Sequence, residues 1–425
     1  MNEADWTRAG ALYVPVVLAL LAGTLQKRRP RQFAACLVSG LWVLSSLLAV
    51  QRLNEWAGWW SYPDAGILFR RMPLELYLGW VVLWGLVPQL AFPRLAIGWS
   101  AAMMIAADLI AMPMCTAVVR LGPRWLLGEA AAVALVLVPA LCIARWTLED
   151  THLLQRATMQ VVTSGMVFLF LLPELVFALR PGMGWGALLL LPSWKRQLGL
   201  QAIVLLAVPG VGAVVEFAER GLGTPIPYDP PKRLVTSGIY RYCANPMQLS
   251  CGLVMFAWAV LLRNGWMALA AGVSIVYSAG IAEWDEGEDL ASRFGVEWRQ
   301  YRSAVPNWLP RWRPYHAGVE ARLYIAGTCG PCSELRSWIE AREPLGLKLI
   351  EAEELPQGSI RRLRYEPGDG SGAVEGVRAL GRALEHLHLG WALSGAALRL
   401  PVVWQGTQLL MDASGLGPRS LGDTH

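Results

Sequence analysis

Nine apolar blocks, each close to the length that a helix needs to cross a bilayer, constrain this chain more than any other feature. They lie at about residues 10–25, 33–50, 73–92, 97–119, 126–144, 157–179, 197–217, 247–263 and 266–283. A membrane span takes about 20 apolar residues, and backbone inside lipid must satisfy its hydrogen bonds within the helix itself. We therefore expect a polytopic α-helical membrane protein with about nine transmembrane helices.

The amino-acid composition also indicates a membrane protein. Of the 425 residues, 55% are hydrophobic and only 16% are charged, whereas about a quarter of an average soluble protein is charged. The net charge of +5 is spread along loops that would face anionic headgroups. Since no nucleic-acid-binding motif accompanies this charge, the sequence indicates a membrane surface and no nucleic acid.

The orientation is predicted from the first segments. Asn2, Glu3 and Asp5 form an acidic leader, which argues against a cleaved signal peptide. Lys27, Arg28, Arg29 and Arg31 follow the first block, and the positive-inside rule keeps such a loop in the cytoplasm. Nine helices then place the N-terminus outside and the C-terminal domain in the cytoplasm. The pairs at 70–71 and 195–196 fall on the opposite side, so the first loop carries this prediction.

The chain divides into three predicted domains. Residues 1–180 form an N-terminal multi-helix membrane domain, and residues 195–312 form a second membrane domain. After Trp284 the apolar blocks end, and prolines at 306, 310 and 314 mark a linker. A soluble α/β domain is expected over residues 321–425.

A basic, aromatic loop at residues 234–247 stands between two apolar blocks. The Pro-rich stretch 223–233 leads into it in extended form. An acidic stretch at 283–290 follows the next two blocks, and the two stretches would meet at one membrane face if the intervening helices form a hairpin. Because polar groups beside lipid are costly, this loop is the first candidate for a functional site.

The loop and the segment after the helix pair share a motif with a known family. They resemble the isoprenylcysteine carboxyl methyltransferases and the related phospholipid N-methyltransferases over about residues 195–312. The residues that fit are Gly238, Tyr240, Arg241, Asn245, Pro246, Met247, Glu286, Leu290, Phe294, Gly295, Tyr301, Val305 and Pro306. Four positions depart from the family pattern: Ala244 replaces Arg or Lys, Gln248 replaces Tyr, Gly287 replaces a second Glu, and Trp298 replaces Tyr.

The resemblance implies transfer of a methyl group from S-adenosylmethionine to a lipid-like or prenylated acceptor. Arg241 and Glu286 are the expected catalytic residues, and Tyr240, Arg241, Asn245, Pro246 and Glu286 are expected to bind the cofactor. A guanidinium can fork onto a carboxylate, and an aromatic face can stabilise a sulfonium cation. The alternative is that Arg241 anchors the chain at the interface and that Glu286 is a solvated charge.

A second motif, Cys329-Gly330-Pro331-Cys332, follows an apolar run at 323–325 and precedes a helical pattern over 333–341. A cysteine at a helix N-terminus has a lowered pKa, which favours dithiol chemistry. Zinc would need two further ligands, and His386 and His388 are interpreted as helix-surface residues. No metal is expected.

Residues 321–421 resemble thioredoxin-like proteins, and in particular the small Cys-x-x-Cys family called DCC oxidoreductases. A helix at 376–384, Trp391, and an expected strand Val402–Trp404 after Arg399-Leu400-Pro401 support the resemblance. It implies that Cys329 and Cys332 exchange disulfides with a thiol-containing protein partner. Because Ala326-Gly327-Thr328 lacks the family's usual Asp, a redox-inactive binding role stays open.

The N-terminal region offers the fewest motifs. The segments 56–63, 66–67 and 72–76 resemble the small multi-helix carotenoid cyclase and hydratase proteins, with Pro73 and Glu75 at a helix start. This resemblance implies a polyisoprenoid-like ligand, and an interfacial aromatic belt is the alternative. Asp108 is a further candidate, because a carboxylate at membrane depth faces a partner or a cavity.

Two function classes follow. The chain is either a membrane methyltransferase with an added thiol-disulfide module, or a membrane-anchored thiol-disulfide oxidoreductase with an inactive methyltransferase-like scaffold.

Overall fold

The computed structural model describes residues 3–418 except 26–29, 65, 181, 227, 317 and 356–360, and it leaves the side chains of 281–286 undescribed. The chain divides into two compact units. The first comprises Met1–Gly186 with Ile226–Asp229, and the second comprises Ala187–Pro225 with Pro230–His425.

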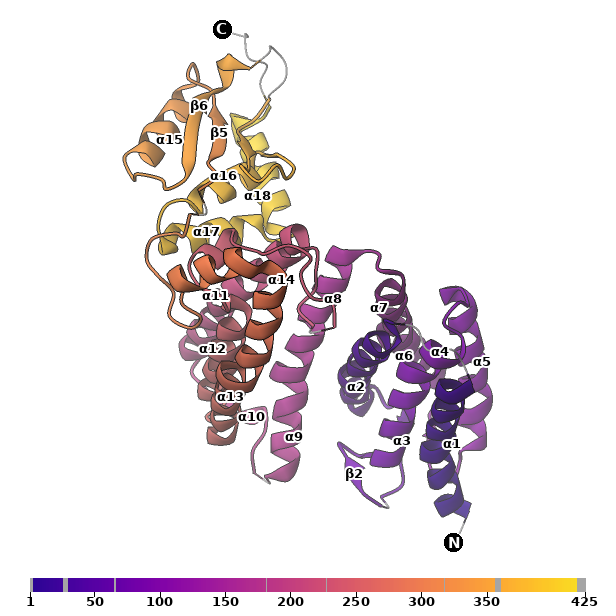
Figure 1. Cartoon of the computed structure of the whole chain (residues 1–425). Helices are drawn as coiled ribbons and strands as arrows, with labels where there is room; N and C mark the ends of the chain where they lie inside the picture. Colours follow the sequence, from indigo (N-terminus) through magenta and orange to yellow (C-terminus); the bar gives the residue numbers. More distant parts are fainter. Residues whose placement is uncertain are drawn as a thin grey trace. The chain divides into compact units, whose positions relative to one another are not determined.

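The first unit is helical (Figure 1). Its helices are α1 (Glu3–Leu25), α2 (Gln32–Ala57), α3 (Leu74–Trp80), α4 (Val87–Ala91), α5 (Ile97–Met114), α6 (Trp125–Ala132), α7 (Val138–Glu149), α8 (Leu153–Met166) and α9 (Leu172–Leu179). Two short antiparallel pairs, β1 (Trp60–Ser61) with β4 (Arg120–Leu121) and β2 (Leu68–Phe69) with β3 (Met72–Pro73), accompany them.

Three membrane helices of this unit pass through a widened turn instead of breaking. The π-helical segments η1 (Val81–Leu86), η2 (Val133–Leu137) and η3 (Val167–Leu171) join the α-helices on either side. Each stands just before a proline, namely Pro88, Pro139 or Pro173. Proline lacks an N–H and its ring collides with the carbonyl four residues earlier, so a widened turn relieves the clash.

The core of the first unit lies around α2, which packs against α7 and η1. Fully buried Val43, Trp84, Val136 and Leu137 belong to this core.

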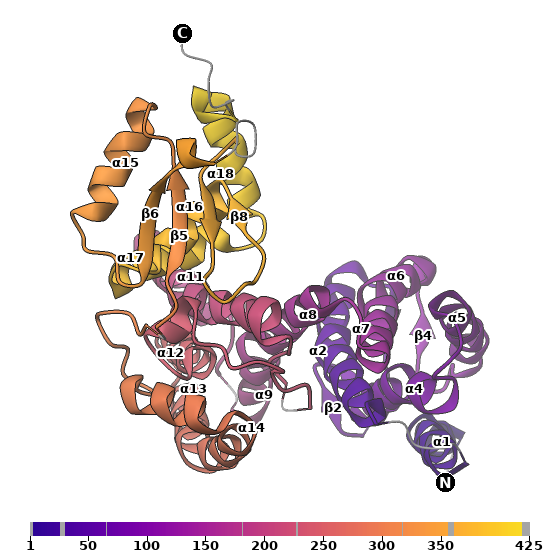
Figure 2. The ribbon, with the colours of Figure 1, turned by 45° about the horizontal axis from the view of Figure 1, so that its top comes forward.

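The second unit begins with a membrane part. Its helices are α10 (Gly186–Leu189), α11 (Ser193–Glu216) with the π-helical turn η4 (Phe217–Gly221), the 3₁₀ turn η5 (Gly238–Arg241), α12 (Pro246–Leu261), α13 (Gly265–Tyr277) with η6 (Ser278–Ala282), and α14 (Glu283–Ala304). Helix α11 packs along α12, and α12 packs along α13, side by side in Figures 1 and 2. The α12–α13 pair therefore forms the hairpin on which the expected meeting of the basic loop and the acidic stretch depends.

Each of the nine apolar blocks contains a helix, although the block at 97–119 extends beyond the end of α5 at Met114, and only part of the expected count of nine spans is met. Seven helices of the described chain are long and apolar enough to cross a membrane: Glu3–Leu25, Gln32–Ala57, Leu74–Ala91, Ile97–Met114, Trp125–Glu149, Leu153–Leu179 and Ser193–Gly221. The other two, Pro246–Leu261 and Gly265–Gly280, are shorter. The 16 residues of α12 extend over about 24 Å, less than the ~30 Å hydrocarbon core. Pro246 and the turn before Gly265 set this length.

The C-terminal part of the second unit has a four-stranded sheet. Its elements are β5 (Ala321–Ile325), α15 (Gly330–Glu340), β6 (Leu347–Glu351), β7 (Arg364–Glu366), β8 (Val374–Glu375), α16 (Val377–Leu384), α17 (Leu389–Arg399) and α18 (Val403–Met411). The strand order is β6-β5-β7-β8, with β5 parallel to β6 and antiparallel to β7. The sheet stands between α15 and α18 in both views (Figures 1 and 2).

The strand expected at Val402–Trp404 is wrong. Val402 caps α18, the Trp404 amide donates to the Leu400 carbonyl at 3.1 Å, and the Gly406 amide donates to the Val402 carbonyl at 2.9 Å. The Gln405 side chain accepts from the Val402 amide. Three apolar residues cannot distinguish a strand from a helix start, and here the local hydrogen bonds decide for the helix.

The expectation that His386 lies on a helix surface is also wrong. Its ring is 1% exposed. Nδ1 lies 2.8 Å from the Leu345 carbonyl, and Nε2 lies 3.0 Å from the Tyr365 hydroxyl. Because a carbonyl only accepts, Nδ1 carries the proton and Nε2 accepts from Tyr365. The imidazole is thus a neutral link between β7 and the end of α16.

This buried imidazole predicts a loss of stability in mild acid. Burial, helped by the positive charge of Arg241, holds the pKa of His386 well below 6.5, although its hydrogen bond to Leu345 opposes this shift. Below pH 6.5 the imidazole of His386 binds a proton in the unfolded chain but not in the folded chain. The free energy of unfolding therefore falls by up to about 1.4 kcal/mol per pH unit. Denaturant titrations of the full chain between pH 7.5 and 5.5 measure it. His386→Asn, which keeps the donor to Leu345, should lose this slope, and an unchanged slope would contradict the assignment.

Candidate functional site

The basic loop begins with a glycine that no other residue can replace without strain. Gly238 has φ +61°, and an added Cβ would lie 3.0 Å from Cδ of Glu216 on α11. The Ser237 hydroxyl donates a hydrogen bond to the same carboxylate. The loop therefore starts in direct contact with the end of a membrane helix.

The expected proline linker is a structured strap along this loop. The Ala244 amide donates to the Pro306 carbonyl at 2.9 Å, and the Asn245 amide donates to the Asn307 carbonyl at 3.2 Å. In the other direction, the Arg311 amide donates to the Tyr242 carbonyl at 2.9 Å. These bonds hold the loop and the linker in one piece.

Helix α14 supports the loop from the other side. The buried Tyr301 hydroxyl donates to the Tyr240 carbonyl at 2.8 Å, and Tyr301 packs with Ala244 and Val305. The helix is interrupted at Gly295, where φ is +55° and ψ is −116°, a conformation that glycine alone adopts readily. The motif residues Gly295, Tyr301 and Val305 thus shape the support of the loop.

The side chain of Arg241 has a buried hydrogen-bond donor, Nε, that no described residue satisfies. The side chain is half-buried, and its Nη1 donates to the Tyr315 carbonyl at 3.4 Å. Its Nε is buried and has no hydrogen-bond partner in the described part of the chain. The guanidinium is also close enough to Tyr365 and His386 of the C-terminal part to act electrostatically on both. A buried N–H without a partner is costly, and an anion would satisfy it.

The other predicted cofactor-binding residues have different surroundings. Tyr240 is 7% exposed and packs near Phe217, with the ring centroids 6.4 Å apart. Asn245 is the half-buried residue before α12, and Pro246 is the first residue of that helix. Glu286 lies on α14, but its side chain lies outside the described residues.

Sequence reasoning missed a buried ion cluster behind this loop. Glu216 on α11 is fully buried and pairs with Arg382 of α16, whose Nη1 lies 2.6 Å from Oε2 and 2.7 Å from Oε1. Nη1 of Arg399 from α17 lies 2.9 Å from Oε2 of Glu216, and Glu385 pairs with both arginines. Burial lowers the pKa of Arg382, but the negative charges of Glu216 and Glu385 raise it by more, so the net shift of this pKa is upward.

This cluster joins the C-terminal helices to the loop. The Tyr242 hydroxyl donates to the Glu385 carbonyl at 2.9 Å. The signal in the sequence was a glutamate at the end of an apolar block together with arginines on helices with apolar faces. Only a charged partner across the fold makes that pattern tolerable, because a buried charge needs a counter-charge.

The two motif cysteines lie together at the start of α15. Cys329 precedes the first residue of the helix, and its Sγ lies 2.7 Å from Sγ of Cys332. Both cysteines are half-buried. The Glu353 carboxylate accepts hydrogen bonds from the Gly327 and Thr328 amides at 3.0 and 3.2 Å. Slight burial raises the pKa of Glu353, but these amides lower it more, so a carboxylate does stand beside the dithiol loop.

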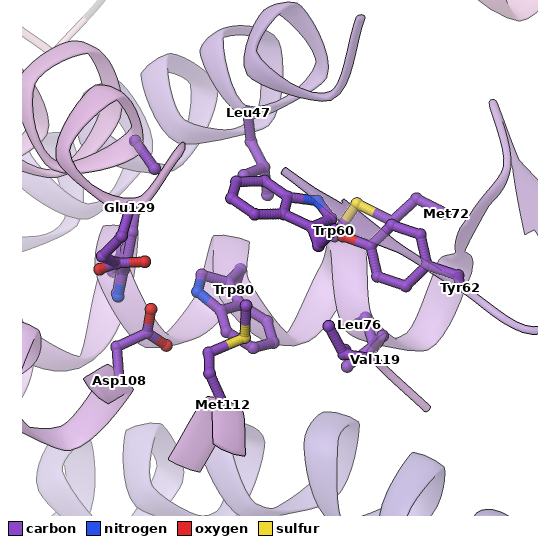
Figure 3. Close-up of a pocket in the computed structure, with 12 residues that line it drawn as sticks. Leu47, Trp60, Tyr62, Met72, Leu76, Trp80, Asp108, Met112, Val119 and Glu129 are labelled. Atoms are coloured by element: carbon purple, nitrogen blue, oxygen red, sulfur yellow. The ribbon is translucent and has the colours of Figure 1, made fainter. Parts of the chain in front are cut away.

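Asp108 faces a second carboxyl group, which sequence reasoning did not identify. It is buried in the first unit with Glu129, and both line one cavity (Figure 3). Among the described residues, no group of three or more His, Cys, Asp or Glu side chains could hold a metal ion.

One family matches part of the chain. The model of the family described as phospholipid methyltransferase matches residues 221–295, which include the loop, the α12–α13 hairpin and the first half of α14. No curated protein and no solved structure gave a significant match. The segment 221–295 of this helical membrane chain is therefore similar to phospholipid methyltransferases.

Proposed function

We propose that this chain is an integral-membrane, S-adenosylmethionine-dependent methyltransferase that acts on a lipid-like or prenylated acceptor. The family match over residues 221–295 supports this class of enzyme. The observation that carries the proposal is the buried Nε of Arg241, which has no partner in the described chain and would suit a carboxylate. We place the protein in the cytoplasmic membrane, with the N-terminus outside and the C-terminal domain in the cytoplasm.

The residues of the loop fit the polar end of this cofactor. Arg241 would hold its carboxylate through Nε, as a charge-assisted hydrogen bond. Glu286, one helix pair further along the chain, would bind its amino or hydroxyl groups, and Tyr240, Asn245 and Pro246 would shape the wall. When bound, S-adenosylmethionine supplies a methyl group activated by the neighbouring sulfonium.

The chain's own task is then to align an acceptor and to exclude water. The buried rings of Tyr240 and Tyr242 in the loop, and of Tyr301 on α14, keep water away from the loop backbone. Large apolar side chains on α12 and α13 are exposed, among them Phe256, Val260 and Val276. Such a surface suits lipid, so an acceptor held in the bilayer would reach the loop along these helices.

Binding of S-adenosylmethionine to the detergent-purified full chain tests the proposal. Calorimetry should show one saturable site that Glu286→Ala weakens by at least about tenfold, because a charged hydrogen-bond acceptor is lost. The matched control is Glu297→Ala, an exposed glutamate on the same helix, which should leave binding unchanged. A folded wild-type protein that does not bind S-adenosylmethionine would refute the methyltransferase proposal.

The dithiol favours a second function. We propose that residues 321–421 form a thioredoxin-like domain that exchanges disulfides with a thiol-containing protein partner. The strand order β6-β5-β7-β8 and the motif at a strand-to-helix turn support this fold. The Sγ–Sγ separation of 2.7 Å supports reversible closure between Cys329 and Cys332. In one version of this proposal, disulfide exchange accompanies the methyltransferase activity. In the other, the methyltransferase-like scaffold is inactive and disulfide exchange is the function of the chain.

Replacing Cys332 by serine should trap the partner. The Cys329 thiolate attacks a partner disulfide, forms a mixed disulfide and releases the partner's other sulfur as a thiolate. Normally the Cys332 thiolate then attacks Cys329, which frees the reduced partner and leaves Cys329–Cys332 oxidised. In Cys332→Ser the second attack is lost, and a reducible covalent adduct should accumulate with a disulfide peptide as the probe. The control Cys329→Ser should form none, and equal adducts in both variants would contradict the roles.

A further inference from the structure

A small cavity in the first unit has two carboxyl groups on one wall and aromatic rings on the others. Its volume is about 30 Å³. Asp108 of α5 and Glu129 of α6 face each other there, the ring of Trp80 lies beside them, and Trp60 and Tyr62 lie farther from them (Figure 3). A cavity of this size holds about two water-sized groups.

The carboxyl pair has no cation within the described chain. Asp108 is 3% and Glu129 is 6% exposed. The two groups interact with each other, and no arginine, lysine or histidine of the described residues pairs with either. Oε1 of Glu129 has no hydrogen-bond partner there.

Every other buried acid in the described part of the chain has arginine partners. Glu174, fully buried, pairs with Arg52 and Arg70. Asp229 pairs with Arg31 and Arg156. In the second unit, Glu216 and Glu385 share Arg382 and Arg399. Against this background, Asp108 and Glu129 differ from the other buried acids, because no cationic side chain of the described residues balances them.

The aromatic walls suit an organic cation. The faces of tryptophan and tyrosine rings attract cations, most strongly where water is excluded. Tyr62 and Trp80 are half-buried, whereas Trp60, Trp84 and Met112 are buried. Because Tyr62 and Trp80 keep part of their surface exposed, a long apolar chain attached to the cation would leave the cavity on their side.

We propose that this cavity binds a primary ammonium group carried by an amphiphile, such as an amine-headed lipid. The carboxyl pair supplies the counter-charge, and the rings of Trp80 and Tyr62 cover the methylene groups next to the nitrogen. The cavity volume selects a primary ammonium over a trimethylated one, since three methyl groups exceed the space of two water molecules. This site is in the first unit and does not depend on the methyltransferase proposal.

Binding of three probes to the full chain in an uncharged detergent tests the site. Calorimetry should show saturable binding of octylammonium and at least about tenfold weaker binding of octyltrimethylammonium. Octanol should show no saturable binding, and its signal measures partition of the alkyl chain into the micelle. Equal binding of octanol, or no binding of octylammonium, would overturn the proposal. Displacement of octylammonium by millimolar sodium would identify an inorganic cation site instead and would also overturn it.

Variants locate the binding. Asp108→Asn with Glu129→Gln keeps the side-chain shapes and should weaken octylammonium binding at least about tenfold, since both charge-assisted contacts are lost. Trp80→Leu should weaken it about fivefold or more, whereas Trp80→Phe should retain most of it. The matched control is Glu149→Gln, an exposed carboxylate of the same unit that pairs with Arg145. Unchanged binding in the double variant would refute the site, and the three-probe comparison in the wild-type protein decides even if that variant does not fold.

Discussion

Replacing Glu216 by alanine is expected to destabilise the second unit by about 3–5 kcal/mol, the range for removing one partner of a buried ion pair. The substitution leaves Arg382 and Arg399, which are 3% and 6% exposed, with Glu385 as their remaining fully buried partner. It also removes the acceptor of the Ser237 hydroxyl. Denaturant titration of the full chain in detergent measures the change. Hydrogen exchange over residues 377–399 should rise at the same time, because helices α16 and α17 lose their attachment to α11.

An exposed ion pair provides the control for this effect. In α15, Nε of Arg336 lies 2.9 Å from Oε1 of Glu340, and 49% of the Glu340 side chain is exposed. Glu340→Ala should cost less than about 1 kcal/mol, as surface pairs do. If Glu216→Ala and Glu340→Ala cost the same, the cluster does not hold the C-terminal helices on the membrane part. A double-mutant cycle with Arg382→Ala then isolates the coupling between Glu216 and Arg382.

Replacing Arg241 by alanine is expected to weaken S-adenosylmethionine binding by roughly 100-fold or more, in line with the loss of a buried charged partner. Its buried Nε has no partner in the described chain and offers a carboxylate one charge-assisted hydrogen bond, whereas alanine offers none. Arg241→Lys keeps the charge but loses the planar donor arrangement, so an intermediate loss of about tenfold is expected. Calorimetry on the full chain compares the three proteins.

The control for Arg241 is Arg299→Ala, an exposed arginine on α14. Its binding should equal that of the wild-type protein, which separates a specific contact from a general change in surface charge. Unchanged binding in Arg241→Ala would place the cofactor away from this loop. Lost binding together with a lowered unfolding midpoint would instead point to a structural role, since Arg241 also contacts Tyr315.

The positions of the apolar helices could be predicted, whereas only seven of the nine expected spans are long and apolar enough to cross a membrane. Apolar blocks of about 20 residues have few alternatives, because lipid leaves the backbone no other hydrogen-bond partners. The sequence did not predict that Pro88, Pro139 and Pro173 would each follow a widened turn, nor that α12 would be only 16 residues long. Those details depend on how each helix packs at its ends.

The candidate site was predictable only as a segment. Tyr240, Arg241, Asn245 and Pro246 are neighbours in the sequence, so their proximity needs no fold. Which of them retains an unpaired donor is a tertiary property, since Tyr315 comes from a strap 74 residues away. Likewise, the short strand expected at Val402–Trp404 failed because local hydrogen bonds to Leu400 and Val402 outweigh the β-propensity of two valines.

By itself, the sequence determined the membrane class, the helix order, the polar loop after α11 and the dithiol motif. These are local properties, set by hydropathy, proline and glycine positions and residue spacing. Only the tertiary structure decided which charges are paired: Glu216 with Arg382 and Arg399, and Asp108 with Glu129 and no described cation. The reason is physical, because the cost of a buried charge depends on partners that lie far away in the sequence and adjacent in space.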